Sequence, residues 1–190
     1  MHSISAIIAV FDDETLAEAA VDRLSDLLAS RAAITVAGVD RADCVLPINL
    51  YKVDQRVRIW GRPSGLWQRQ WPIFADGVSL PSPGSGATFV LGYMASAVIA
   101  ALDGWVSATG AEVFGSALEG IGVPADDATM AQASLLAGKI IVMTNARIDN
   151  GVLLPAIAGA VAIRLYDAVS AAPAMPSADQ AFHVEMHCQT

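Results

Sequence analysis

The sequence predicts an α/β protein of the α+β class, built as a single domain of 190 residues. Ile4 to Phe11 is an apolar run rich in β-branched residues, and acidic residues of the kind that start helices follow it directly. Farther along, the stretch from Gly120 to Thr144 has the pattern of a helix followed by a strand. With 54% hydrophobic residues and 16% charged ones, the chain can bury one sizeable core.

The first part of the chain is predicted as strand, helix and strand. Leucines and alanines recur at helical spacing from Asp13 to Ser30, which predicts an amphipathic helix with one face on a sheet. The acidic residues Asp12 to Glu14 suit the start of this helix as caps and dipole partners, and a metal site is the alternative. Ala33 to Val39 is predicted as the next strand, and Val45 to Trp60 as a further extended region.

The segment from Lys52 to Trp71 is basic and aromatic. It holds five basic residues against one acid, a local charge of +4 in a chain of net charge −8, and three of the four tryptophans. Tryptophan prefers the membrane interface and basic residues are attracted to anionic headgroups, which favours a surface that docks on a membrane or a partner. The alternative is a solvated strand face whose arginines pair with acids elsewhere. The candidate docking residues are Arg56, Arg58, Trp60, Arg62, Trp67, Arg69 and Trp71.

The most apolar part of the chain runs from Ala87 to Leu102, sixteen residues without a charge. It is shorter than the roughly 20 residues that a membrane-spanning helix needs, so it predicts a buried or interfacial helix. Small residues are dense here and let helices approach closely. We expect a long helix or a helical hairpin that packs on a copy of itself or on another protein, and contact with a bilayer is the competing interpretation.

The stretch from Gly120 to Thr144 carries the clearest start and stop signals. Pro124 suits the first helical position, and acidic residues in the following turn favour the helix dipole. Gly138 can adopt the left-handed conformation that ends a helix. Ile140 to Met143 is then a continuous apolar run of strand length.

After this strand, Asn145 to Gly151 is predicted as a turn and Val152 to Val169 as a second apolar helix. The last ten residues, Ala181 to Thr190, alternate as a strand does. Such a strand can add to the edge of its own sheet or of a neighbour's, and strand exchange between subunits follows as a hypothesis. One face of this strand carries the candidate ligands of a divalent metal, and the alternative is an exposed polar face; these residues are His183, Glu185 and His187.

Charge and motifs disfavour several classes of function. A net charge of −8 disfavours nucleic acid as a partner. Cys44 and Cys188 have neither redox nor zinc spacing, and the N-terminus lacks the pattern of a secretory signal, so a cytoplasmic protein is expected. The chain has no complete dinucleotide fingerprint, no phosphate loop and no Gly-x-Ser-x-Gly, and no catalytic residue is nominated.

Three separated stretches carry a resemblance. The run from Ala6 to Asp13 with the helix behind it, then Leu118 to Pro124, then Gly138 to Val142, resembles a bacterial family of unknown function. Some members of that family are described as general-stress proteins or small membrane proteins. The resemblance covers about Ser5 to Asn145 and carries over no catalytic residues. It implies a ferredoxin-like βαββαβ sandwich with an apolar helical insertion, to which this chain adds a C-terminal helix and strand.

These expectations combine into one domain with four parts. They are a strand-helix-strand-strand half (1–65), an apolar helical insertion (66–120), a closing helix and strand (121–145) and a C-terminal extension (146–190). We expect a non-enzymatic, homo-oligomeric assembly or docking protein without a cofactor, stress-related and peripheral to the inner face of the membrane. The alternatives are a protein that binds a metal or small molecule through the C-terminal histidines, and a structural subunit of a larger enzyme complex.

Overall fold

A computed structural model describes residues 3–4, 6–40, 52–53, 56–57, 65–82, 86–102 and 109–166. The protein belongs to the α+β class, as predicted. Within the described ranges, no helix combines the length and the apolar character needed to cross a membrane.

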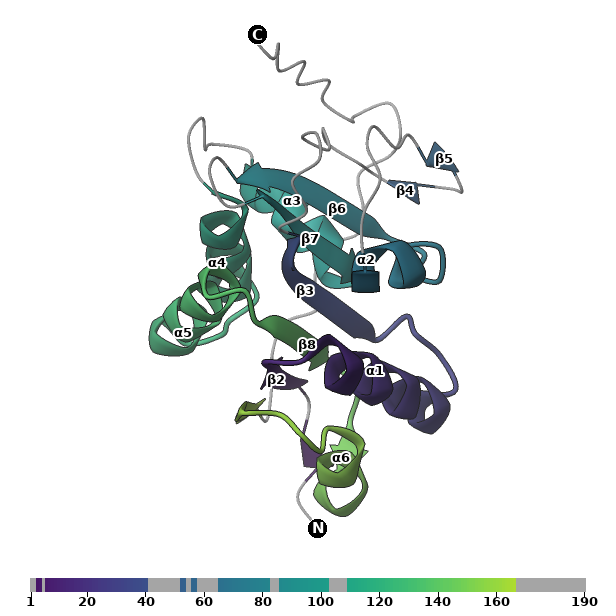
Figure 1. Cartoon of the computed structure of the whole chain (residues 1–190). Helices are drawn as coiled ribbons and strands as arrows, with labels where there is room; N and C mark the ends of the chain where they lie inside the picture. Colours follow the sequence, from purple (N-terminus) through teal and green to yellow (C-terminus); the bar gives the residue numbers. More distant parts are fainter. Residues whose placement is uncertain are drawn as a thin grey trace, which may run out of the picture.

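The centre of the fold is a six-stranded sheet in which all neighbouring strands are antiparallel (Figure 1). Two further pairs of two-residue strands lie apart from it: β1 (Ser3–Ile4) with β9 (Ile148–Asp149), and β4 (Lys52–Val53) with β5 (Arg56–Val57). The order of the large sheet is β10 (Ala162–Tyr166), β2 (Ala6–Phe11), β8 (Ile140–Thr144), β3 (Ile34–Asp40), β7 (Gly86–Gly92) and β6 (Gly77–Ser82).

Helices cover both faces of this sheet, so the fold has three layers (Figure 1). Alternate residues of one strand point to opposite faces, and in β2 Ile7 packs with one set of helices while Ile8 packs with the other. Burial on both sides explains why the central strands are continuous apolar runs. One face carries α1 (Glu14–Leu28), α2 (Gly65–Gln70) and α6 (Asn150–Ala156), and the other carries α3 (Met94–Leu102), α4 (Gly110–Gly120) and α5 (Ala125–Leu136).

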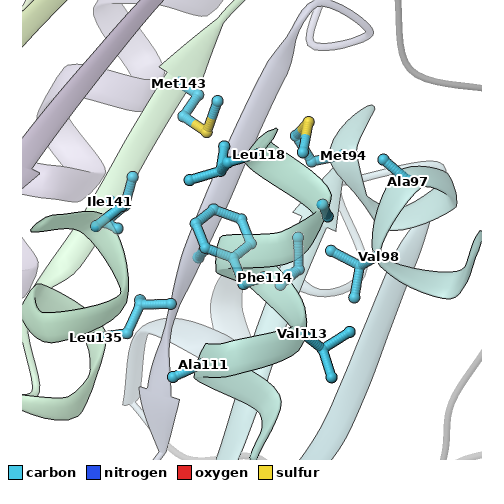
Figure 2. Close-up of a cluster of buried hydrophobic side chains, with 14 of the residues drawn as sticks. Met94, Ala97, Val98, Ala111, Val113, Phe114, Leu118, Leu135, Ile141 and Met143 are labelled. Carbon is cyan, nitrogen blue, oxygen red and sulfur yellow. The ribbon is translucent and has the colours of Figure 1, made fainter. Parts of the chain in front are cut away.

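The core between the sheet and α3, α4 and α5 centres on Phe114, which is fully buried in α4 (Figure 2). Leu118, one turn farther along α4, belongs to the same cluster as Met94 of α3 and Met143 of β8. Methionine packs well in such a cluster because its unbranched, flexible side chain adapts to the irregular space between helices and sheet.

Two helix boundaries follow the sequence signals closely. Asp13 is the N-cap of α1, and its side chain accepts a hydrogen bond from the Leu16 amide at 2.9 Å. Gly138 has a φ of 81° just after α5, the left-handed conformation predicted for it. Pro124 lies one position earlier than predicted, as the residue that precedes the first helical turn.

The prediction of a long helix or hairpin from Ala87 to Leu102 is wrong for its first half. That half is strand β7, and only Met94–Leu102 is helical. The chain changes direction at Gly92, whose φ of 99° is unfavourable for residues with a side chain. The Thr35 hydroxyl then accepts a hydrogen bond from the Met94 amide at 3.0 Å, which satisfies a free donor at the start of α3.

The prediction of a helix from Val152 to Val169 is right as far as Ala156 and wrong from there to Tyr166, and the residues after Tyr166 lie outside the described part of the chain. Helix α6 ends at Ala156, and a turn with Gly159 at a φ of 97° leads into β10. The segment 145–151, predicted as a turn, contains β9 and the start of α6. An apolar run alone does not distinguish a buried strand from a buried helix, and here pairing with β2 decides the outcome. The predicted strand at Ala181–Thr190 lies outside the described residues.

Candidate functional site

The basic segment meets the acidic helix α1 through α2. Arg69 donates to both carboxylate oxygens of Glu18, from Nε at 3.0 Å to Oε1 and from a terminal nitrogen at 2.9 Å to Oε2. Gln70 donates to the same carboxylate at 2.9 Å, and its own amide oxygen accepts from Arg31 at 3.0 Å. The hydrogen bond from Arg69 lowers the pKa of Glu18, although partial burial of the carboxylate opposes that effect. Arg69 therefore pairs with an acid elsewhere in the fold, as the alternative interpretation of this segment predicted.

Trp67 and Trp71 are core residues, which corrects the docking role predicted for them. Both are at least 96% buried, with exposed fractions of 3% and 4%. Trp67 stacks on Phe89 of β7 with ring centroids 5.3 Å apart, and Trp71 meets the same ring edge-on at 5.8 Å. Buried in this way, neither indole has a face available to a membrane or a partner.

The other predicted site residues are outside the part of the chain whose side chains the structure describes. They are Arg56, Arg58, Trp60 and Arg62 of the docking set and His183, Glu185 and His187 of the metal set. Their roles remain predictions. Among the described residues, no group of three His, Cys, Asp or Glu side chains is placed to hold a metal ion.

The edge of the sheet at β10 has the properties of an interaction surface. Within the described ranges, β10 pairs with β2 on one side only and ends the strand order. Leu165 lies opposite Ile7, so it projects on the face that carries α1 and α6, and it is 42% exposed. Val161, just before the strand, is 53% exposed.

Three more exposed apolar side chains belong to the elements beside this edge. Leu16 of α1 is 43% exposed and lies against the turn between α6 and β10, where a β-carbon on Gly159 would be 3.2 Å from its Cδ1. Arg23 of α1 donates to the Ala156 carbonyl at 2.9 Å and fixes α6 in place. We define the β10 edge surface as Val161 and Leu165 together with Leu16, Val152 and Leu154.

The one charged residue of β10 is neutralised by an acid on α5. Arg164 donates from Nε to the Asp127 carboxylate at 2.7 Å, and the Tyr166 hydroxyl donates to its other oxygen at 3.0 Å. Burial raises the pKa of the Tyr166 phenol, and the hydrogen bond to Asp127 raises it further. Charged side chains often protect an edge strand from pairing with another chain, and Arg164 is held in an ion pair on the α5 face instead.

The opposite edge of the sheet differs from β10. Strand β6 contains Pro81, which has no amide hydrogen to donate to an added strand. The two edges are therefore unequal, and β10 is the better template for pairing.

The β10 edge surface was missed at the level of sequence. The signal was present in Ala162–Tyr166, which alternates and is rich in residues that favour strands, but the apolar residues before it suggested a continuous helix. Comparisons of the chain with family models, curated proteins and solved structures find no match.

Proposed function

We propose that this protein is a non-enzymatic assembly protein whose chains associate with one another along β10. The observation that carries the proposal is an edge strand with exposed apolar side chains whose only charge is held in an ion pair. Two copies of an antiparallel edge strand can pair about a two-fold axis, because the same surface then serves both chains. The large sheet would continue from one subunit into the next.

The composition of the chain supports the same conclusion. With 54% hydrophobic and 16% charged residues, the protein has little charge with which to cover its surface. Association along the β10 edge surface would remove Leu165 and Val161 from water. Burial of apolar area is the main favourable term in subunit association.

The experiment is to measure mass in solution by light scattering after size exclusion, over a range of protein concentrations. We expect the wild type to be dimeric or larger, and we expect Leu165→Lys and Val161→Lys to shift the equilibrium toward monomer. Ile73→Lys is the matched control, because Ile73 is 49% exposed and lies in the turn between α2 and β6, the strand at the opposite edge of the sheet. A wild type that stays monomeric at high micromolar concentration contradicts the proposal. The proposal is also contradicted if Ile73→Lys dissociates the protein and the two variants at β10 do not.

We further propose a relationship between the central strands and the βαββαβ unit of ferredoxin-like proteins. What supports it is the strand arrangement: β2 and β3 are parallel with β8 between them, and β7 and β8 are parallel with β3 between them. Each half is therefore a split βαβ unit. The helices of the two halves lie on opposite faces, β8 and β3 form the central pair, and β10 and β6 extend the edges, so the relationship is limited to the split βαβ arrangement of each half.

A further inference from the structure

Helix α2 covers a row of residues on the sheet that contains an unsatisfied polar group. The row crosses three strands at Gly38 of β3, Phe89 of β7 and Ser79 of β6, which are direct neighbours in the pairing. Phe89 is the ring on which Trp67 stacks and which Trp71 meets edge-on. Ser79 is fully buried beside Phe89, and its Oγ has no hydrogen-bond partner within the described structure.

A second unsatisfied group belongs to Trp71, whose ring meets the same phenylalanine. Nε1 of Trp71 is buried and has no acceptor among the described residues. A β-carbon on Gly77 would lie 3.2 Å from the Trp71 ring, so the indole rests on β6 two residues from Ser79 and on the same face. Buried polar groups in folded proteins almost always have a hydrogen-bond partner. The two unsatisfied groups around Phe89 therefore indicate a partner that the protein chain itself does not supply.

We propose that Trp71 Nε1 and Ser79 Oγ form a binding site for a neutral oxygen atom, supplied by a water molecule or by the carbonyl or hydroxyl group of a small apolar molecule. An indole nitrogen only donates, whereas a hydroxyl both donates and accepts, so an oxygen can accept from Trp71 and exchange a hydrogen bond with Ser79. The surrounding side chains are aromatic or aliphatic, which disfavours an ion. A buried water typically makes two to four such bonds.

The test compares Ser79→Ala, Trp71→Phe and the double variant by chemical denaturation. A bridging oxygen couples the two groups, so we expect each single change to raise the unfolding equilibrium constant about three- to tenfold and the double change to raise it by less than the product. Ser96→Ala is the control, because Ser96 is a buried serine that already donates to the Tyr93 carbonyl at 3.2 Å. In the double variant Ser96→Ala/Trp71→Phe, the effects of the two changes on the unfolding equilibrium constant should multiply.

Two further measurements identify the source of the oxygen and do not depend on the fate of the tryptophan variant. The first is magnetisation transfer by NMR from water to the Trp71 indole proton. A transfer that is present in the wild type and lost in Ser79→Ala indicates a bound water. A small molecule retained in native mass spectra and lost in Ser79→Ala indicates an organic ligand. The proposal would be overturned if Ser79→Ala and Trp71→Phe had independent effects on stability, if both variants were at least as stable as the wild type, and if neither the water signal nor a retained small molecule were found.

Discussion

A β-carbon placed on Gly38 would lie 2.6 Å from Cζ2 of Trp67. Real β-carbons do not approach other atoms so closely, so the indole can lie on strand β3 only because this position has no side chain. Gly77 lies under Trp71 on the other side of β7, where a β-carbon would be 3.2 Å from Cζ3 of the indole and 2.8 Å from Cδ2 of Leu91. The two glycines therefore make the space that two tryptophans of α2 and the turn after it fill.

Gly38→Ala should destabilise the protein by about 1–3 kcal/mol, because the added methyl meets a rigid ring in a packed core. Alanine also lowers the conformational entropy of the unfolded chain, which stabilises the folded state by up to about 1 kcal/mol. This gain is too small to make the substitution stabilising. Gly120→Ala is the control: Gly120 ends α4 and a β-carbon there would meet nothing within 4 Å. Urea denaturation of both variants checks the prediction, and equal stabilities would contradict it.

Thr35→Val should leave the Met94 amide without its acceptor and destabilise the protein by about 1–3 kcal/mol. Valine keeps the shape of threonine, so the loss reports the hydrogen bond and not the packing. Hydrogen exchange provides the specific readout, since the Met94 amide should exchange faster in Thr35→Val and keep its protection in Thr35→Ser. Unchanged exchange in Thr35→Val would show that the hydroxyl does not hold the start of α3.

The parts of the fold that the sequence predicted well are those with local signals. The runs that became β2, β3 and β8 are long, apolar and β-branched, α1 begins at the capping residue Asp13, and α5 is followed by Gly138 in the left-handed conformation. The failures, at Ala87–Leu102 and Val152–Val169, are apolar runs whose strand halves are determined by pairing with distant strands. No local signal contains that information.

The candidate site was harder to predict for a related reason. Tryptophan and arginine together suggested an exposed surface at Trp67, Arg69 and Trp71, yet α2 turns the two rings inward and the guanidinium toward Glu18. The glycines opposite the rings lie 29 positions before Trp67 and 6 positions after Trp71, and nothing in the sequence alone connects them with the indoles.

The ion pair between Arg69 and Glu18 predicts a dependence of stability on pH. The pKa of Glu18 is lowered below its ordinary value of 4.5 in the folded protein, so the unfolded chain binds the proton more tightly. The contribution is fully present above pH 4.5 and is lost as the pH falls through the lower, folded pKa. We expect the difference in unfolding free energy between wild type and Glu18→Gln to be small at neutral pH, because Arg69 is half exposed, and to shrink on acidification.

The control for this prediction is Glu119→Gln, which removes the same charge from an exposed position at the end of α4. Parallel denaturation series between pH 3 and pH 7 would compare the two variants. A difference for Glu18→Gln that stays constant over this range would mean that the ion pair does not hold α2 against α1.

Asp127 should control self-association through the charge on Arg164. The carboxylate of Asp127 lies in the first turn of α5, where the helix dipole favours an anion. Its Oδ1 lies 2.7 Å from Nε of Arg164 and so holds the guanidinium on the α5 face. Asp127→Asn keeps the shape but releases a positive charge at the edge of each subunit. Like charges across an antiparallel pair are unfavourable by roughly 0.2–1 kcal/mol, which corresponds to an increase of up to about fivefold in the dissociation constant.

The double variant Asp127→Asn/Arg164→Gln separates this effect from a local loss of structure, because it removes the released charge while keeping the asparagine. We expect it to restore association toward that of the wild type in sedimentation measurements, whereas raised salt should partly restore the single variant by screening. If the double variant associates as weakly as Asp127→Asn, the defect lies in the contact between α5 and β10 and not in a charge at the edge.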